Sequence, residues 1–304
     1  MAPKIIILLG PTAVGKSELA LALAGAFGGE IINADSQQVY RYLDIGTAKP
    51  SPQDRERVPH HLIDIVNPDE EFNVGLFRRL AAESIADAHR RDRKVVVCGG
   101  TGLYLKALSR GLFEGPGQNA DIRAELARRI ETEGQASLYR RLAQIDPTVL
   151  STIHPNDRQR TIRALEVFQL TGKPLSQWQK EHAFQEQPYE VLKIGLNLLR
   201  EELYDRINER CARMVEAGLL EEVRGLVAKG YELALKPLRS VGYRQMGQVL
   251  QGRRELPAAI DEMKQETRRL AKRQLTWFRA DPEVRWFHPR EKDLIFEAAS
   301  LFFG

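Results

Sequence analysis

The sequence predicts an α/β fold in which a parallel sheet forms the core, an all-helical small domain is inserted into it, and C-terminal helices return to it. Three observations favour this class. Short apolar runs alternate with helical stretches over the first third of the chain, a glycine-rich loop follows the first apolar run, and residues 121–179 have a helical pattern throughout. A chain of 304 residues has room for about two domains.

The first third supplies the predicted sheet elements in order. Residues 4–10 (KIIILLG) are a predicted buried strand, and residues 18–27 are a predicted helix rich in alanine and leucine. A second short strand is predicted at residues 30–36, and a helix over 75–91 leads to a third strand at 94–100 (KVVVCGG). This alternation is typical of a parallel sheet, in which helices connect successive strands.

The connections divide the chain. The loop over residues 41–59 contains three prolines and is long enough to suggest a function of its own. A glycine- and proline-rich stretch at 111–117 is typical of a linker. We therefore predict the first part of the core over residues 1–115, a helical insertion over 116–188, and the completion of the core by basic helices over 189–304.

Helices dominate the rest of the chain. Asn156 and Asp157 are typical N-cap residues for a helix that ends before Gly172. An apolar run at 191–199 follows, and the last long helix is predicted over 257–279, with proline at its first turn. The spacing of apolar residues predicts that several side chains of this helix face the core: Ile260, Met263, Thr267, Leu270, Ala271, Gln274 and Phe278. We also expect Trp277 to pack in the core.

Positive charge is concentrated near the C-terminus. The whole chain carries 45 basic and 41 acidic residues, a formal +4, whereas residues 236–290 alone carry +7. Lys264, Arg268 and Lys272 recur at helical spacing and form a basic stripe on the last long helix. Such a segment fits either a polyanionic partner or ordinary solvated helix faces, and charge alone leaves both open.

The composition excludes several classes of protein. With 43% hydrophobic and 28% charged residues, the chain is neither of low complexity nor disordered. No apolar run approaches the ~18 residues that a membrane span needs, and the N-terminal residues lack a signal-peptide pattern. Two cysteines, Cys98 and Cys211, cannot form a disulfide framework or a cysteine-only zinc site. We expect a soluble, cytoplasmic protein.

The strongest local signal is the segment GPTAVGKS, which matches the phosphate-binding loop (P-loop) pattern G-x-x-x-x-G-K-[ST]. The predicted strand before it and the predicted helix after it are the context that this motif requires. Backbone N–H groups of such a loop cradle an anion, the lysine adds positive charge, and the serine hydroxyl is a Mg²⁺ ligand. The residues expected to bind phosphate are Gly10, Thr12, Ala13, Val14, Gly15, Lys16 and Ser17.

A P-loop identifies the bound group but not the reaction. No apolar strand ends in the aspartate that a motor ATPase needs, and the guanine-recognition tetrapeptide N-K-x-D is absent. Asp35, at the end of the second predicted strand, lies where parallel sheets bind ligands. Its carboxylate could hold Mg²⁺ or act as a general base, or Asp35 or Ser36 could merely cap a helix.

Together these motifs resemble the tRNA dimethylallyltransferase (tRNA isopentenyltransferase) family, bacterial type. The resemblance covers nearly the whole chain in nine ordered segments: GPTAVGKS at Gly10, DSQQVY at Asp35, DIGTAKP at Asp44, PHHLIDI at Pro59, GGTGLYLKAL at Gly99, HPNDRQR at His154, RALEVF at Arg163, SVGYRQM at Ser240 and AKRQLTWFR at Ala271. Eukaryotic members often add a C-terminal zinc finger, and the sequence shows no Cys/His cluster of that kind.

The resemblance implies transfer of a dimethylallyl group from dimethylallyl diphosphate to the N6 amine of the adenosine 3′-adjacent to the anticodon of a tRNA. The P-loop would then hold the diphosphate leaving group, with Mg²⁺ as cofactor and Ser17 as its ligand. Asp35 matches the residue that accepts the proton of the amine, Thr101 matches a position near the diphosphate and the target base, and Lys16 assists catalysis. Arg210 resembles an arginine on the diphosphate, although Arg206 and Arg213 lie close to it in the sequence.

The matching segments also imply contacts with the anticodon stem-loop of tRNA. These residues are Asp35, Ser36, Gln37, Gln38, Thr101, Arg123, Gln159, Arg160, Arg163, Arg239, Gly242, Tyr243 and Arg244. The basic segment would contact the tRNA backbone, because phosphate contacts dominate the affinity for nucleic acids. No protein partner is evident from the sequence, and we expect a monomer without membrane association.

Two other functions remain open from the residues alone. A small-molecule or nucleoside kinase would use the same loop for ATP, with the helical insertion as a lid. A non-catalytic RNA-binding protein would keep the loop as a vestige, although Lys16, Ser17 and Asp35 are all intact. His60 and His61 lack a third ligand at suitable spacing, so we expect them to form structural hydrogen bonds rather than a metal site.

Overall fold

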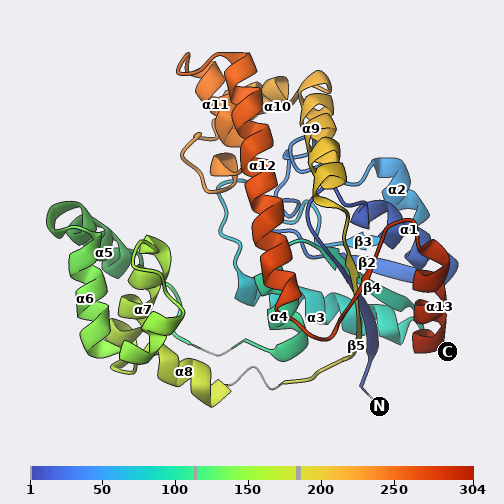
Figure 1. Cartoon of the computed structure of the whole chain (residues 1–304), viewed down its shortest axis with the longest axis horizontal. Helices are drawn as coiled ribbons and strands as arrows, with labels where there is room; N and C mark the ends of the chain where they lie inside the picture. The colour runs from blue at the N-terminus through green and yellow to red at the C-terminus, as the bar shows by residue number, and fades with distance from the viewer. Residues whose placement is uncertain (1, 113–114, 183–185) are drawn as a thin grey trace. The chain divides into compact units, whose positions relative to one another are not determined.

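The computed structural model describes residues 2–112, 115–182 and 186–304, so the linker predicted at 111–117 lies partly outside the described residues. The chain forms two compact units (Figure 1). The first combines Met1–Ser109 with Gln187–Gly304, and the second is Arg110–Glu186. The first unit is therefore built from both ends of the sequence, and the second is an insertion between them.

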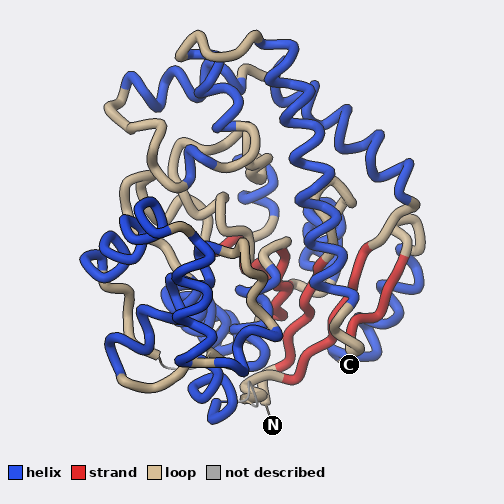
Figure 2. The backbone as a smooth tube through the Cα atoms, turned by 60° about the vertical axis from the view of Figure 1, so that its left-hand side comes forward, coloured by secondary structure: helices blue, strands red, loops and turns tan. Residues whose placement is uncertain are grey.

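A parallel sheet of six strands, in the order β3-β2-β4-β1-β5-β6, forms the centre of the first unit (Figure 2). The strands are β1 (Lys4–Leu9), β2 (Gly29–Asn33), β3 (His60–His61), β4 (Lys94–Gly99), β5 (Glu190–Leu196) and β6 (Val284–Phe287). In the register of the sheet, Leu9 lies opposite Gly99 on one side and Gly195 on the other. The carboxyl ends of β1, β4 and β5 therefore lie side by side, which is where such sheets bind ligands.

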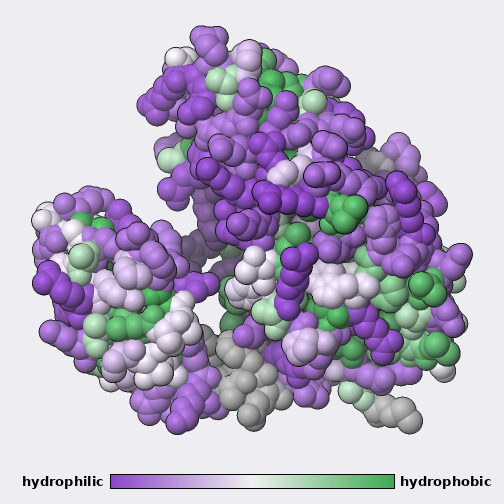
Figure 3. All heavy atoms as spheres, in the orientation of Figure 1, coloured by the Kyte–Doolittle hydropathy of each residue, from purple (hydrophilic) through white to green (hydrophobic). Residues whose placement is uncertain are grey.

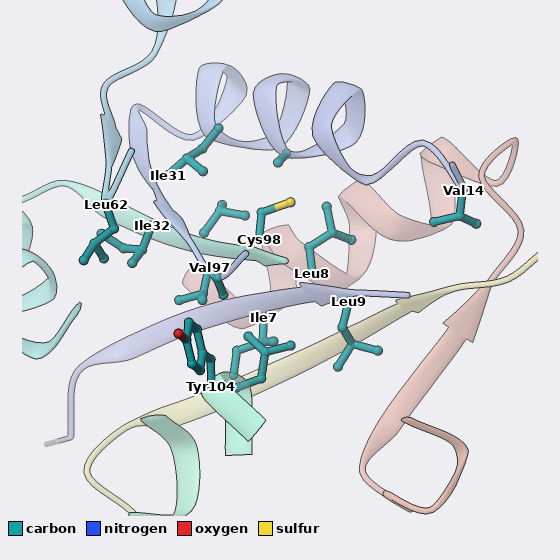
Figure 4. Close-up of a cluster of buried hydrophobic side chains, with 14 of the residues drawn as sticks. Ile7, Leu8, Leu9, Val14, Ile31, Ile32, Leu62, Val97, Cys98 and Tyr104 are labelled. Atoms are coloured by element: carbon teal, nitrogen blue, oxygen red, sulfur yellow. The ribbon is translucent and has the colours of Figure 1, made fainter. Parts of the chain in front are cut away.

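Apolar side chains cover both faces of the sheet. In Figure 4, Leu8, Ile31 and Cys98 lie on the side of α1, whereas Ile7 and Tyr104 lie on the other side. Residues 5–9 of β1 are all buried, as expected for a strand that is covered on both faces. The helices of this unit are α1 (Lys16–Ala26), α2 (Pro52–Arg57), α3 (Val74–Arg90), α4 (Gly102–Arg110), α9 (Arg200–Glu216), α10 (Leu219–Ala228), α11 (Tyr243–Leu250), α12 (Leu256–Arg279) and α13 (Lys292–Phe303).

The structure confirms the three strands and the flanking helices predicted in the first third of the chain. The apolar run at 191–199 contains a further strand, β5, which the sequence analysis did not identify as a strand, and two short edge strands were also missed. β3 has only two residues, and β6 has four, of which Arg285 is exposed. Elements this short carry too few residues for a recognisable alternation, and they form because a neighbouring strand offers its free edge.

The second unit is helical and has its own hydrophobic core. Its helices are α5 (Ala120–Glu133), α6 (Gln135–Ile145), α7 (Arg158–Thr171) and α8 (Leu175–His182), with a short 3₁₀ turn at Pro147–Ser151. Leu126, Leu142 and Leu165 meet in the core. The predicted caps of α7 are confirmed, because the Asp157 side chain accepts the N–H of Arg160 and a left-handed Gly172 ends the helix.

Hydrophilic side chains predominate on the surface over α12 and its neighbours (Figure 3). Across the described residues, no helix combines the length and the apolar character that crossing a membrane requires.

Candidate functional site

The P-loop leads from the end of β1 into α1. Gly10 and Gly15 have φ of 148° and 100°, backbone conformations that favour glycine. A side chain at Gly10 would also meet the carbonyl oxygen of Leu196 at 2.6 Å. The side chain of Val14 is buried in the core, so only its backbone is available to a ligand. The loop thus has the strained, closely packed backbone of an anion cradle.

Lys16 closes the loop from within. Its ammonium donates hydrogen bonds to the carbonyl oxygens of Gly10 and Pro11, at 3.0 and 2.7 Å. Burial lowers the pKa of Lys16 to about 8, and the positive charge of Arg210 adds to this decrease, while Asp35 opposes it. An anion bound beside Lys16 would therefore relieve an unfavourable concentration of positive charge.

Asp35 lies just beyond the carboxyl end of β2. Its Oδ1 accepts the N–H of Gln37 at 2.8 Å, and its own N–H donates to Asn33 Oδ1 at 3.2 Å. A turn follows rather than a helix, so the alternative of a helix cap at Asp35 or Ser36 is wrong. Within the described residues, Oδ2 has no hydrogen-bond partner, which leaves this oxygen able to accept a proton from a ligand.

Thr101 connects the turn after β4 to the turn after β2. Its hydroxyl oxygen accepts the N–H of Ser36 at 3.1 Å, and its own N–H donates to the carbonyl oxygen of Ala34 at 3.3 Å. A side chain at Gly99 would overlap the backbone of Ala34, so the close approach of the two turns requires glycine. The predicted catalytic residues Asp35 and Thr101 are thus brought together.

Two adjoining cavities open at this edge of the sheet. The inner cavity, of about 100 Å³, is lined by Lys16, Ser17 and Cys98 among others. The wide cavity, of about 510 Å³, is lined by Thr101 and by arginines of the C-terminal segment. The two share six lining residues, namely Thr12, Asp35, Thr47, Gly100, Arg210 and Gln274.

Arg210 is distinguished from its neighbours on α9. Arg206 is paired with Glu202 at 3.0 Å, and Arg213 lines only a third, outer cavity of about 1010 Å³. Arg210 lines the inner, wide and outer cavities alike. Burial lowers the pKa of Arg210 and the carboxylate of Asp35 opposes this decrease. Arg210 is the one of the three arginines that lines the inner cavity beside the P-loop.

Several predicted tRNA contacts line these cavities. Ser36, Gln37, Arg239 and Arg244 line the wide cavity. Gln38 lines the inner cavity, and its amide donates to the carbonyl oxygens of residues 47 and 48 at 3.1 and 3.3 Å. These residues come from two separate segments, 36–38 and 239–244, which the fold brings to one place.

Tyr243 differs from its prediction as a tRNA contact. Its side chain is completely buried, and Gly242 is buried beside it at the start of α11. Burial, together with the charge of Glu222, raises the pKa of Tyr243, so its hydroxyl stays protonated and acts as a donor. In this structure the Tyr243 side chain stabilises the protein interior and does not reach the surface.

The predicted tRNA contacts in the second unit have unequal surroundings. Gln159 and Arg160 are exposed. Arg123 and Arg163 instead contact Glu166, which is 0% exposed, with nitrogen–oxygen distances of 2.8 Å for each arginine. Burial raises the pKa of Glu166, but the hydrogen bonds from the two arginines outweigh it and hold the pKa below its ordinary value. Both arginines therefore have a structural partner within this unit.

Glu222 of α10 holds a loop that lines both cavities. Its carboxylate accepts the backbone N–H groups of Asp44, Ile45 and Gly46, at 3.0, 2.7 and 3.2 Å. The Tyr243 hydroxyl donates to the same carboxylate at 2.5 Å. A side chain at Gly46 would overlap the Tyr243 ring. Sequence reasoning missed Glu222, because nothing in the local sequence marks it.

Gln274 of α12 also escaped prediction as a site residue. Its side-chain oxygen accepts the N–H of Thr12 at 2.9 Å, and its side-chain nitrogen donates to the carbonyl oxygen of Gly100 at 3.0 Å. Gln274 is partly buried and lines both cavities rather than packing in the core, and the expectation that Trp277 packs in the core was wrong. Trp277 is 41% exposed and lies against Gly102, because that face of α12 meets the turn after β4 at the protein surface.

The remaining side chains near the loop have ordinary roles. Cys98 is buried, and burial raises its pKa to about 11, so the thiol stays protonated. His60 bonds to the carbonyl oxygen of Val58 at 2.7 Å, and His61 bonds to Glu30 at 2.7 Å, as expected for structural histidines. In the described part of the chain, no three His, Cys, Asp or Glu side chains cluster as a metal site would require.

The chain is similar to known proteins over almost its full length. A family model described as "IPP transferase" matches residues 38–281. The "tRNA dimethylallyltransferase 2" of Syntrophus aciditrophicus is 51% identical, over 99% of this chain and 96% of the relative. The crystal structure of the tRNA isopentenylpyrophosphate transferase of Bacillus halodurans is 40% identical, with a TM-score of 0.73, and the match covers 98% of this chain and 96% of that one.

A more distant structure adds information on the substrate. It is described as a eukaryotic dimethylallyltransferase acting on tRNA and is 30% identical, with a TM-score of 0.78. The match covers 94% of this chain and 74% of that one.

Proposed function

The chain belongs to the IPP transferase family, and we propose that its inner and wide cavities hold the two substrates of the family's reaction next to each other. The enzyme transfers a dimethylallyl group from dimethylallyl diphosphate to the N6 amine of the adenosine 3′-adjacent to the anticodon in tRNA, and diphosphate is released. The kinase and the non-catalytic alternatives are set aside, because the relatives that match nearly the whole chain are named as dimethylallyltransferases.

The diphosphate occupies the inner cavity, against the P-loop. Backbone N–H groups at the start of α1 point at the anion, and Lys16 and Arg210 add two positive charges that are partly removed from water. In such surroundings, charges stabilise the leaving diphosphate more strongly than they would in water. The developing negative charge is thus balanced where the bond to the allylic carbon breaks.

Asp35 accepts the proton of the attacking amine. The adenine N6 is a weak nucleophile, because its lone pair is delocalised into the ring. As the N6–carbon bond forms, the carbon–oxygen bond breaks, diphosphate leaves with the electron pair, and the N6 proton passes to the carboxylate of Asp35. A positioned base of this kind contributes about 10²–10⁴-fold to the rate. The Thr101 hydroxyl accepts the N–H of Ser36 next to Asp35, and Thr101 lines the wide cavity in which the adenine lies.

The target adenosine enters through the wide cavity. It must leave the anticodon stack, at a cost of about a few kcal/mol, and contacts with neighbouring bases and phosphates offset this cost. Arg239, Arg244 and Arg273 line the wide cavity and carry the charge for phosphate contacts. In this proposal, the basic segment at residues 236–290 binds the phosphate backbone of tRNA.

Mg²⁺ is part of this proposal as the cofactor. The exposed Ser17 lines the inner cavity beside Asp35, whose Oδ2 is available, and the described residues offer no all-protein cage. This donor set fits Mg²⁺, which usually binds through one or two protein oxygens together with phosphates of the substrate. When bound, the ion supplies positive charge to the diphosphate, and Ser17 would hold it.

The proposal depends mainly on one observation: Asp35 and Arg210 both line both cavities. Asp35 can act on the amine, and Arg210 can bind the diphosphate. The test incubates the protein with unmodified tRNA, dimethylallyl diphosphate and Mg²⁺, and detects isopentenylated adenosine by mass spectrometry. We expect product, strongly reduced in Asp35→Ala, and no dependence on ATP. Consumption of ATP without prenylated product would support a kinase instead.

A further inference from the structure

Gln274 connects the two halves of the reaction site. It lies on α12 and reaches two segments that are 262 and 174 residues away in the sequence. The same side-chain amide accepts from the N–H of Thr12 in the P-loop and donates to the carbonyl of Gly100 beside the catalytic turn, at 2.9 and 3.0 Å. One planar group therefore spans the gap between the diphosphate side and the target-base side.

The absence of a side chain at Gly100 makes room for the Gln274 amide. A side chain at Gly100 would overlap the Gln274 amide, so glycine is needed for the amide to reach the carbonyl. The other end of the P-loop segment is held by Lys16, which donates to the carbonyls of Gly10 and Pro11. The first half of the loop is thus fixed from both sides, and Gln274 supplies the bond on the side of the target base.

The contacts form a chain through the site. Thr12 is bound to Gln274, Gln274 to Gly100, and the next residue, Thr101, to the N–H of Ser36 beside Asp35. Transfer of the allylic group requires the amine, the carbon and the leaving oxygen to be aligned. A displacement of ~1 Å in such an arrangement can cost about 100-fold in rate.

We propose that Gln274 is a positioning residue, which sets the separation between the P-loop and the turn that carries Thr101, and so aligns the diphosphate donor with the target amine. This inference rests on the proposed function of the two cavities. The Gln274 amide acts through Thr12 and Gly100 and has no chemical step of its own. Its loss lowers the turnover rate, while both substrates keep their main binding groups.

The first test replaces Gln274 with methionine, which has a similar length but cannot bridge the two backbone groups. We expect kcat to fall by about 30-fold or more, with the KM of each substrate within about threefold of the wild type. The matched control is Gln265→Met, an exposed glutamine on the same helix, with both constants within about twofold of the wild type. An unchanged kcat, or a loss confined to KM, would overturn the proposal.

The second test uses Gln274→Glu, which keeps the acceptor for Thr12 but sets an ionised oxygen against the Gly100 carbonyl. A protonated carboxyl restores the donor. Contact with the Gly100 carbonyl favours this protonated form, whereas Lys16 and Arg210, which line the same inner cavity, favour the ionised form. We expect the ratio of wild-type to variant kcat to shrink as the pH falls from 8 to about 5.5. A ratio that stays constant over this range contradicts the bridge.

These tests distinguish a failure of the proposed function from a failure of the inference about Gln274. If the wild-type protein makes no prenylated tRNA, the proposed function fails. If the wild type is active and both Gln274 variants match it, only the inference about Gln274 fails. Thermal unfolding of each variant shows whether it is folded, and Gln274→Glu serves as the test if the methionine variant is not.

Discussion

Replacing Glu222, which is not itself a predicted substrate contact, with alanine perturbs the wall of the active site. The carboxylate accepts three backbone N–H groups and the hydroxyl of Tyr243, at 2.5–3.2 Å. Hydrogen bonds to a charged group contribute about 1.5–3 kcal/mol each. The N–H of Asp44 is exposed and regains water, which leaves three bonds to count. Because these three bonds are only partly buried, each counts at the lower end of this range, and we expect the free energy of unfolding to fall by about 4–5 kcal/mol.

The assay is urea unfolding, followed by both fluorescence and circular dichroism, so that agreement of the two probes supports a two-state analysis. The matched control is Glu221→Ala. Glu221 is the preceding residue on α10. Its carboxylate is exposed and, among the described residues, is paired only with Arg224, so its loss should cost at most about 1 kcal/mol. Hydrogen exchange of the amides at residues 44–46 should accelerate in Glu222→Ala alone.

A double-mutant cycle tests the bond between Glu222 and Tyr243. Tyr243→Phe removes one charge-assisted bond and should cost about 1–2 kcal/mol, with a coupling energy of similar size in the double variant. A Glu222→Ala variant as stable as Glu221→Ala, or simply additive effects at Glu222 and Tyr243, would show that Glu222 does not hold the loop in this way.

Three other changes have defined outcomes. Burial lowers the pKa of Lys16 to about 8, so Lys16 loses its charge as the pH rises through that value. We expect kcat/KM for dimethylallyl diphosphate to decrease above pH 8. This decrease must be missing from the pH profile of Lys16→Ala. Glu166→Ala leaves Arg123 and Arg163 without their buried partner and should destabilise the second unit by about 3–5 kcal/mol, seen as loss of α-helical circular dichroism at lower temperature. Lys272 is exposed on α12, and Lys272→Gln should reduce the slope of log K for tRNA against log salt concentration by about 1; an unchanged slope would exclude Lys272 from the interface.

Local motifs account for the part of the site that the sequence analysis predicted. The P-loop is contiguous, and Asp35 follows a strand whose apolar residues are unmistakable, so both could be located without knowledge of the fold. Their proximity follows from the parallel sheet, because the carboxyl ends of β1, β2 and β4 share one edge.

Long-range contacts account for what was missed. The partner of Thr12 is Gln274, 262 residues later, and no local pattern predicts such a pair. The segment SVGYRQM likewise mixes the partly exposed Arg244 with the buried Tyr243 and Gln245. Matching a family segment identifies the region but not which of its side chains face the ligand, which depends on how α11 packs.

Single-turnover kinetics of Asp35→Asn test the central claim most directly. This variant keeps the size of the side chain but cannot accept a proton, while Lys16 and Arg210 still hold the diphosphate. With both substrates saturating, we predict that the rate of prenyl transfer falls by about 10²–10⁴-fold, and that the Kd for dimethylallyl diphosphate and for tRNA changes by less than about threefold. A rate close to that of the wild type, or a loss that appears only in Kd, would contradict the role of Asp35 as the base.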